Sequence, residues 1–266
     1  MLDRFERNIN YLRISVTDRC NLRCRYCMPE EGVTLMRHED ILTYDEITDF
    51  TRMAVAAGIT KVRITGGEPL VRKGVTDLVA RLSGIEGISD QSMTTNGVLL
   101  ADYAGRLVDA GLMRVNVSLD TIDAGKYRYV TRGGEITDVF RGITAAQETG
   151  LRPVKINCVI KGTPDEADAR TVADYCMREG LEVRFIRQMD LASGTFSVVH
   201  GGSGGHCARC NRLRLTPDGM VKPCLFSDRG YSVRELGAAE ALRRAVEEKP
   251  ERGTVNNVNC FYNIGG

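Results

Sequence analysis

Three cysteines lie within eight residues in the stretch CNLRCRYC, which spans residues 20–27. Structural zinc sites take four ligands, and no histidine stands beside these three thiols. Soft thiolates on a short loop instead suit the iron and sulfide of a cubic iron–sulfur cluster. Three protein ligands leave one iron of such a cluster open. The spacing therefore predicts that Cys20, Cys24 and Cys27 hold a [4Fe-4S] cluster with room for an external ligand.

A second group of cysteines consists of Cys207, Cys210 and Cys224. The first two flank the dipeptide Ala-Arg, and the third follows on the far arm of an expected hairpin. A zinc site is a serious alternative here, because a C-x-x-C pair is a common zinc ligand set and His206 offers a fourth ligand. The sequence leaves both kinds of metal site open for this group.

Cations inside apolar strands form the third feature. Six of them stand in such stretches: Arg13, Arg63, Lys155, Arg184, Arg212 and Arg214. Burial of a charge is costly unless it has a partner, and the last two, being two residues apart, share one strand face. We predict that the six point into one lumen and bind an anion there, since arginine contacts phosphate with two hydrogen bonds. Ordinary salt bridges with Glu68, Asp120 or Glu182 are the alternative.

The composition bounds the remaining function classes. The 266 residues carry a formal net charge of +1, which argues against a nucleic-acid polymer as partner. We find no apolar stretch long enough for a membrane span, and MLDRFERNIN is too charged for a secretion signal, so we expect a cytoplasmic protein without a membrane partner. Nine cysteines, an odd number, indicate metal or redox chemistry rather than disulfides. Cys158 and Cys176 are expected in the core, and no role is indicated for Cys260.

Short β-branched stretches alternate with amphipathic ones as far as Met189. Expected strands cover 11–16, 59–66, 91–97, 114–120, 152–160 and 182–189, and expected helices cover 44–58, 73–85, 101–111, 136–150 and 165–180. These elements make about six βα units, which predict an α/β fold whose parallel sheet curves into an open, partial TIM-like barrel. Functional loops of such barrels follow the carboxyl ends of the strands. The stretch CNLRCRYC lies in such a loop.

The alternation stops after Met189. Residues 190–205 form a Gly/Ser-rich link, residues 212–226 predict a hairpin that turns at Pro217-Asp218-Gly219, and a helix is expected near 232–248. We therefore expect two domains, a partial barrel over 1–189 and a small C-terminal iron–sulfur domain over 190–266 that ends in two glycines.

Small polar residues follow several of the expected strands. In ITGGEPL, at the end of the second strand, Gly66 and Gly67 permit a close approach of the backbone to a ligand, although such a pair also suits a tight turn. TTNG and NVSLD place hydroxyl groups at the ends of the third and fourth strands. Each of these motifs is a weak indication when taken alone.

Together the motifs resemble those of a known family. The C-x-x-x-C-x-x-C stretch with an aromatic residue before its last cysteine is similar to the motif of radical S-adenosylmethionine enzymes, and GGEP resembles their motif for the amino group of the cofactor. LRISVTDRCNLRCRYCMP, RITGGEPLVRKG, CARCNRLRLTPDGMVKPCLF and the final IGG resemble, almost end to end, the GTP 3',8-cyclases of molybdenum-cofactor biosynthesis.

The resemblance implies a lyase with two [4Fe-4S] clusters and S-adenosyl-L-methionine as cofactors. In that family the open iron of the first cluster binds S-adenosylmethionine, which one electron cleaves to a 5'-deoxyadenosyl radical. The radical removes hydrogen from the ribose 3' carbon of GTP, and the resulting radical attacks carbon 8 of guanine. The second cluster binds the guanine. The implied partners are GTP or a related purine nucleotide and an electron donor such as flavodoxin or ferredoxin, and whether the chain forms a homodimer stays open.

The resemblance also assigns residues to roles. The iron ligands are the two cysteine groups named above. S-adenosylmethionine contacts fall on Tyr26, Gly67, Glu68, Ser118 and Met189. GTP contacts fall on Arg13, Arg63, Thr94, Lys155, Arg184, Arg212, Leu213 and Arg214. Catalytic roles fall on Arg13, Arg212, Arg214, Gly265 and Gly266.

One departure from the family pattern lies between Met189 and Cys207, where this chain has seventeen residues and the cyclases have far more. The shorter segment predicts a more open mouth of the active site. It also leaves an alternative open, a paralogous radical S-adenosylmethionine enzyme that modifies another nucleotide, a peptide or a small molecule. A zinc-ribbon binding module is the non-enzymatic alternative.

Iron content separates these alternatives. We expect about eight iron atoms and about eight sulfides per chain after anaerobic reconstitution, because two four-iron clusters are predicted. Metal analysis that finds about four irons and one zinc would instead place zinc in the second cysteine group.

Overall fold

The computed structural model describes residues 1–258 and 260–264 of the chain. These residues form one sheet of nine strands in the order β6-β5-β4-β3-β2-β1-β7-β8-β9. The strands are β1 Tyr11–Ser15, β2 Lys61–Thr65, β3 Asp90–Thr95, β4 Arg114–Ser118, β5 Lys155–Ile160, β6 Glu182–Arg187, β7 Arg212–Leu215, β8 Met220–Lys222 and β9 Tyr231–Ser232. Pairing is parallel from β6 to β7 and antiparallel from β7 to β9.

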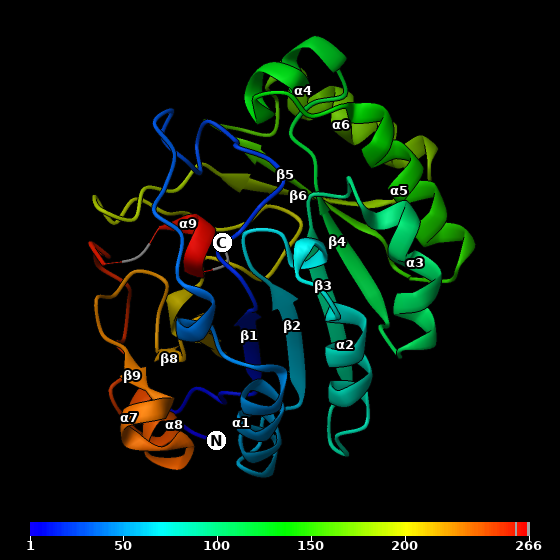
Figure 1. The fold of residues 1–266 in the computed structure, drawn as a ribbon. Helices are drawn as coiled ribbons and strands as arrows, with labels where there is room; N and C mark the ends of the chain where they lie inside the picture. The colour runs from blue at the N-terminus through cyan, green and yellow to red at the C-terminus, as the bar shows by residue number, and fades with distance from the viewer. Residues whose placement is uncertain (259, 265–266) are drawn as a thin grey trace.

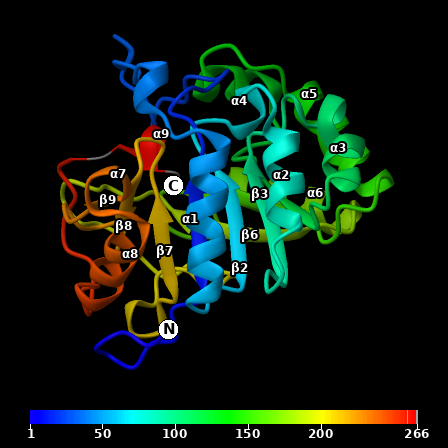
Figure 2. The same cartoon turned by 60° about the horizontal axis from the view of Figure 1, so that its bottom comes forward.

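Helices connect the strands and cover the outer face of the sheet (Figure 1). They are α1 Tyr44–Ala56, α2 Val75–Ser83, α3 Leu100–Asp109, α4 Ala124–Thr131, α5 Ile136–Glu148, α6 Ala167–Arg178, α7 Val233–Leu236, α8 Ala238–Glu247 and α9 Phe261–Ile264. Short 3-10 turns occupy His38–Asp40, Pro69–Val71 and Cys207–Arg209. In Figure 2 the helices α1 and α2 lie in front of the central strands. Within the described residues, no helix is both long and apolar enough to span a membrane.

The predicted α/β fold with an open, partial TIM-like barrel is confirmed. The six expected strands and five expected helices all occur, with ends that differ by a few residues. Helix α4 was not predicted, because a glycine and β-branched residues obscure its pattern; Asp123 begins it by accepting a hydrogen bond from the Lys126 N–H at 2.7 Å. The single helix expected near 232–248 is divided at Gly237, whose φ of 78° ends α7 before α8 starts.

The C-terminal hairpin continues the barrel sheet. Its turn at 217–219 is confirmed by the antiparallel pair β7 and β8, and Gly219 adopts a φ of 85° in that turn. Strand β7 also pairs in parallel with β1, which the sequence analysis did not predict. The sheet and its apolar core therefore run across residue 190, and the division into domains at that point stays a prediction.

Alternation along the strands separates an apolar side from a polar side. Leu12 and Ile14 of β1 and Leu213 and Leu215 of β7 are fully buried in the core under the helices. Cys158 and Cys176 are buried in the same core, as predicted. A smaller apolar cluster joins the C-terminal segments: Leu191, Leu225, Phe226 and Ile264. The residues between the core positions face the lumen, so the strand pattern itself selects which side chains reach the site.

Local hydrogen bonds fix the entry into α1. The Thr43 hydroxyl accepts from the Glu46 N–H at 3.2 Å, and the Glu46 carboxylate accepts from the Thr43 N–H at 2.6 Å. This reciprocal pair is a capping box, which satisfies two backbone donors at the start of the helix. Arg234 of α7 donates to the same carboxylate at 2.8 Å, so the cap also ties the C-terminal segment to α1.

The core under α1 generates a stability prediction. Phe50 is 1% exposed, so Phe50→Ala leaves a cavity and should lower the free energy of unfolding by roughly 3–5 kcal/mol. Met177→Ala is the matched control, because that side chain is 76% exposed and its loss should change stability by less than about 0.5 kcal/mol. Urea unfolding followed by circular dichroism measures both, and equal effects would show that the core is placed wrongly.

Candidate active site

Arginines of neighbouring strands lie in register on the lumen side of the sheet. Arg13 of β1 stands opposite Arg63 of β2 on one side and opposite Arg214 of β7 on the other. Each alternates with fully buried apolar residues of the core, so the three side chains leave the sheet on the same face. The strand pattern thus concentrates positive charge inside the barrel.

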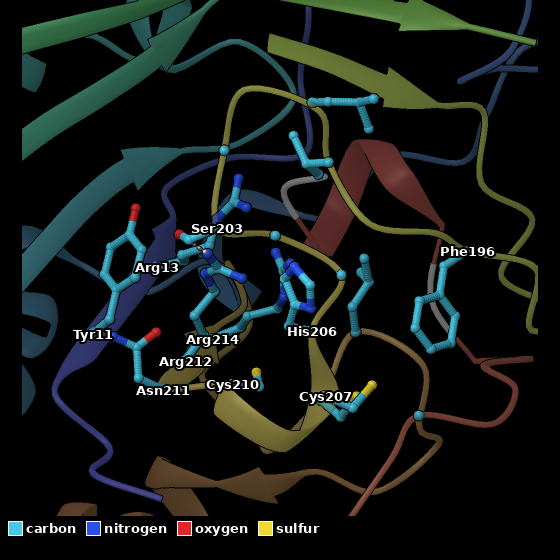
Figure 3. Close-up of a pocket in the computed structure, with 18 of the residues that line it drawn as sticks. Tyr11, Arg13, Phe196, Ser203, His206, Cys207, Cys210, Asn211, Arg212 and Arg214 are labelled. Atoms are coloured by element: carbon cyan, nitrogen blue, oxygen red, sulfur yellow. Dashed lines mark hydrogen bonds between the residues drawn. The ribbon is translucent and has the colours of Figure 1, made fainter. Parts of the chain in front are cut away.

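A cavity of about 300 Å³ lies over this row of charges. Five of the six predicted cations line it: Arg13, Arg63, Arg184, Arg212 and Arg214. Figure 3 shows Arg13, Arg212 and Arg214 near one another, with Tyr11 beside them and His206 toward the cysteines of the second group. The centroid of the Tyr11 ring lies 5.6 Å from Cζ of Arg63 and 5.7 Å from Cζ of Arg212, within the range of cation–π attraction.

Burial among like charges disfavours the charged form of these arginines. Burial, then the guanidiniums of Arg214 and Arg63, hold the pKa of Arg13 well below its ordinary value. Burial and then Arg212 lower the pKa of Arg214 to about 10. Burial is also the largest cause that lowers the pKa values of Arg63 and Arg184. A negatively charged ligand in the cavity would offset both the burial and the mutual repulsion.

Carboxylates neutralise part of the lumen charge. Glu182 pairs with Lys155, so the salt-bridge alternative describes Lys155 correctly. Asp90 pairs with Arg114 at 2.5 Å, and both of these residues line the cavity. The ion pairs in the described part of the chain do not include Arg63, Arg184 or Arg212. These three guanidiniums therefore lack a carboxylate partner within the described residues.

The first cysteine triad lines a second cavity, of about 190 Å³, beyond the carboxyl ends of the strands. Burial is the main cause that raises the pKa values of Cys20 and Cys27 and brings that of Cys24 to about 12, and neighbouring thiols raise those of Cys24 and Cys27 further. Thiols that resist ionisation alone become thiolates when a metal supplies positive charge. The donor set therefore fits an iron–sulfur cluster. All five predicted cofactor contacts line this cavity: Tyr26, Gly67, Glu68, Ser118 and Met189.

The glycine pair after β2 packs against the start of the cysteine loop. The Gly67 N–H donates to the Thr17 carbonyl and the Glu68 N–H to the Arg19 carbonyl, both at 2.8 Å. A Cβ added at Gly67 would lie 2.4 Å from the Arg19 carbonyl oxygen. The close approach that the sequence indicated is therefore made to the backbone of residues 17–19, and it fixes the cysteine loop against β2.

Two carboxyl groups are buried at the second cavity. Glu68 lines the cavity, and Asp120 lies beside it, next to Tyr26. Burial raises the pKa of Glu68 to about 7, although its oxygens accept from the Thr95 hydroxyl at 2.8 Å and the Asn96 N–H at 2.7 Å. Burial raises the pKa of Asp120 as well, and this carboxylate accepts from the Tyr26 hydroxyl at 2.8 Å. Neither carboxyl pairs with the lumen arginines as the salt-bridge alternative supposed. Glu68 lines the second cavity, and its carboxyl group would favour a cationic or hydrogen-bond-donating group of a ligand there.

The second cysteine triad lines the first cavity, beside the arginines. Burial raises the pKa of Cys224. Burial acts in the same direction on Cys210, but Lys249 and Arg212 outweigh it, so the pKa of Cys210 is lowered. Within the described residues, no three His, Cys, Asp or Glu side chains converge tightly enough to hold a single metal ion. This holds for both triads, so the geometry does not separate a zinc ion from an iron–sulfur cluster at the second one.

The structure brings most predicted residues to these two cavities and keeps others away. Thr94 lines the second cavity, and its buried hydroxyl has no hydrogen-bond partner in the described residues. Leu213 is fully buried in the core and lines neither cavity, so its side chain is not available to a ligand. Lys155 faces Glu182 and likewise lines neither cavity. Gly265 and Gly266 lie outside the described residues.

The two cavities share walls. Asn157 of β5, Ile186 of β6 and Met189 line both of them. Ile264 at the end of α9 is buried, and Phe261 and Tyr262 of α9 line the second cavity. The Ser15 hydroxyl donates to the Asn263 carbonyl at 3.1 Å and fixes this C-terminal helix to β1. One ligand in the first cavity would therefore lie next to a ligand in the second.

The short segment after Met189 forms part of the first cavity's wall. Its His200 makes an antiparallel bridge with Phe185 of β6, and its Phe196 stacks on Phe226 with ring centroids 4.5 Å apart. Ser203 accepts a hydrogen bond from Nη2 of Arg212 at 3.2 Å. A Cβ at Gly202 would lie 3.3 Å from Cδ of Arg184, so the glycine leaves room for that side chain. The Gly/Ser-rich stretch is thus packed against the lumen arginines.

Sequence reasoning missed several residues of the site. Arg114 begins β4 and lines the first cavity; the argument from cations in strands would have found it, had it been applied to that strand. Lys249 stands in the charged stretch EEKPERG, which reads as a solvated surface, yet it is 1% exposed. Asn157 carries no motif that marks it.

Family models match both parts of the chain. The Radical SAM superfamily model matches residues 14–176, which hold the first cysteine triad and the strands β2 to β5. The Molybdenum Cofactor Synthesis C model matches residues 171–254, which hold the second triad. Individual relatives decide the family within this superfamily.

GTP 3',8-cyclase of Moorella thermoacetica is 43% identical over 97% of this chain and 96% of its own length. GTP 3',8-cyclase of Geobacter sulfurreducens is 41% identical over 95% of this chain and 93% of its own. The chain belongs to the GTP 3',8-cyclase family of the radical SAM superfamily. The alignment with the Moorella family member covers 310 positions, more than the 266 residues here, so that relative carries residues that this chain lacks.

Solved structures of more distant proteins share the fold. Native anSMEcpe with bound AdoMet has a TM-score of 0.63 at 15% identity, covering 87% of this chain and 80% of that one. Methylornithine synthase (PylB) has a TM-score of 0.58 at 15% identity, covering 95% and 77%. At such low identity the likeness concerns the fold alone, and it agrees with the open barrel described above.

The crowding of like charges generates a second stability prediction. In the absence of ligand, Arg63→Met should raise the free energy of unfolding by about 1–3 kcal/mol, because a well-packed apolar side chain removes a buried charge and its repulsion. Urea unfolding measures this, and Arg178→Met on the exposed side of α6 is the control. Tripolyphosphate should raise the melting temperature of the wild type more than that of Arg63→Met. A destabilised Arg63→Met chain would contradict the charge-crowding account.

Proposed function

We propose that the protein is a radical S-adenosylmethionine lyase that converts GTP to (8S)-3',8-cyclo-7,8-dihydroguanosine 5'-triphosphate, the first step of molybdenum-cofactor biosynthesis. The observation that carries this proposal is the pair of adjoining cavities, each with its own cysteine triad and joined by Asn157, Ile186 and Met189. The relatives named above, which bear the name GTP 3',8-cyclase, support the same reaction.

The second cavity would hold the first [4Fe-4S] cluster and S-adenosylmethionine. Cys20, Cys24 and Cys27 are the ligands, and Glu68 accepts hydrogen bonds from the amino group of the cofactor. When bound, this pair supplies a 5'-deoxyadenosyl radical by one-electron cleavage. The raised pKa of Glu68 follows from burial, and a donor group placed beside it restores the carboxylate form. Tyr26, Gly67, Ser118 and Met189 enclose the remainder of the cofactor.

The first cavity would hold GTP. Its lumen arginines contact the triphosphate, since guanidinium groups bind phosphate oxygens through paired hydrogen bonds. The second triad, with Cys207, Cys210 and Cys224, holds the second [4Fe-4S] cluster on the wall where the guanine lies. This placement sets the ribose between the two cavities, beside the shared wall, where its 3' hydrogen faces the S-adenosylmethionine cavity. A polyanionic nucleotide fits this charge better than a peptide does.

Further roles rest on the family resemblance. Arg13, Arg212 and Arg214 orient the substrate for ring closure, and Thr94 offers its unpartnered hydroxyl to the ligand. Gly265 and Gly266, which lie outside the described residues, act on the radical step. A flavodoxin or ferredoxin donor and a cytoplasmic location stay predictions from the sequence, and whether the chain forms a homodimer stays open.

Loss of one thiol from the first triad tests the proposal. With GTP, S-adenosylmethionine and dithionite under anaerobic conditions, the wild type should release 5'-deoxyadenosine and the cyclised nucleotide, as chromatography and mass spectrometry would show. Cys24→Ala should keep the fold and lose 5'-deoxyadenosine, because three thiolates are needed to hold the cluster with one open iron. Cys260→Ala is the matched control, since this thiol is exposed and outside both triads, and it should keep wild-type activity.

Two results would contradict the proposal. A wild-type chain that cleaves S-adenosylmethionine but leaves GTP unchanged would belong to the paralogous alternative with another substrate. A Cys24→Ala chain that still forms 5'-deoxyadenosine would remove Cys24 from the cofactor site.

A further inference from the structure

Lys249 is a buried cation at the second cysteine triad. It follows α8, is 1% exposed, and belongs to the largest fully buried side chains of the described residues. Its Nζ donates to the Arg212 carbonyl at 2.7 Å and to the Pro223 carbonyl at 2.5 Å. Arg212 lies two residues after Cys210, and Pro223 immediately precedes Cys224. The side chain thus joins the backbone next to two of the three cysteines.

Lys249 also lines the first cavity together with Cys210 and Cys224. Burial lowers the pKa of Lys249, and the two neighbouring thiols act in the opposite direction. An ammonium has three N–H donors, of which the two backbone carbonyls take two. In the described part of the chain, no ion pair joins Lys249 to a carboxylate. The positive charge beside the triad is therefore not cancelled by an acidic side chain.

Arg7 fixes the backbone of the third cysteine, Cys207, by hydrogen bonds of its own. Its Nη1 donates to the Cys207 carbonyl and to the Glu251 carbonyl, both at 2.9 Å. Its Nε donates to the Asp3 carboxylate at 2.6 Å, and both side chains are buried. This cation is neutralised by its partner, so it fixes the backbone of the triad without adding net charge.

We propose that Lys249 is a positioning residue of the second cluster that also raises its reduction potential. A buried positive charge next to two thiolate ligands stabilises the reduced cluster, which carries one more negative charge than the oxidised one. The cluster would then stay a better acceptor for the electron pair of a purine ligand at its open iron. This inference rests on the proposed function, since it requires an iron–sulfur cluster at this triad.

The test separates the effect of the Lys249 charge from the effect of hydrogen bonds that fix the backbone of the second triad. The parent is the full-length chain with Cys20, Cys24 and Cys27 changed to alanine, so that the second cluster alone gives a signal. Lys249→Gln removes the charge and keeps two N–H donors for the carbonyls. Asp3→Asn with Arg7→Gln removes a neutral ion pair at the same triad without a change of net charge. Iron content, melting temperature and an EPR-monitored redox titration are measured for each.

We expect four irons per chain in the parent, in keeping with the cluster type, and a midpoint potential that shifts to more negative values in Lys249→Gln. The Asp3→Asn/Arg7→Gln variant should lose melting temperature yet keep the parent potential. Lys249→Arg keeps the charge and should stay near the parent. Equal potentials in the parent and Lys249→Gln would overturn the inference, as would an equal shift in the double variant. If neither Lys249 variant binds iron, the residue serves assembly and the tuning role is wrong.

These outcomes separate the inference from the proposed function. A parent that binds zinc instead of iron would contradict the proposed function itself. A parent with a full iron–sulfur cluster and a potential that does not respond to Lys249 would contradict the tuning role alone.

Discussion

The burial of like-charged guanidiniums in one lumen is the constraint on which the rest of the structure depends. Arg13, Arg63 and Arg214 stand in register on three adjacent strands, and burial together with repulsion from neighbouring arginines lowers their pKa values. Such an arrangement costs stability in the empty protein. It persists because the apolar residues between these arginines form a continuous core with the helices, and that core holds the strands in register. The barrel thereby keeps a positively charged cavity formed before a ligand arrives, which would lower the ordering cost of binding an anion.

The parallel arrangement explains how one chain brings two cysteine triads to adjoining cavities. The first triad follows β1, at the carboxyl ends of the strands where loops of such barrels carry function. The second precedes β7 and spans the hairpin that β7 begins, and β7 is hydrogen-bonded to β1 on its other edge. Strand β1 therefore lies between the two triads, and the arginines alternate with its core residues. Lys249, which lines the first cavity, and Arg7 then hydrogen-bond the backbone beside the second triad, and only Arg7 has a carboxylate partner among the described residues.

The sequence predicts the parts of this arrangement that depend on local pattern. The alternation of strand and helix gave the open barrel, and cations in apolar strands gave five of the residues that line the first cavity. Local patterns could not predict contacts between segments that are far apart in the sequence. The parallel pairing of β7 with β1 joins residues about two hundred positions apart along the chain, and no local period encodes it. Lys249 was hidden for the same reason, because its burial depends on β7 and the hairpin rather than on its neighbours in EEKPERG. The glycine pair after β2 was found by its residue type, yet its close contact is with the backbone of residues 17–19.

The central claim is that the two adjoining cavities serve one reaction on one nucleotide. GTP labelled with deuterium at the ribose 3' carbon tests it directly, because the proposed site for GTP would bring that carbon beside the cavity proposed for S-adenosylmethionine. Anaerobic turnover by the wild-type chain should transfer deuterium into 5'-deoxyadenosine, as mass spectrometry of the isolated nucleoside would show. Release of 5'-deoxyadenosine without deuterium during conversion of the labelled GTP would contradict the account, because the radical would then act on another position or another molecule.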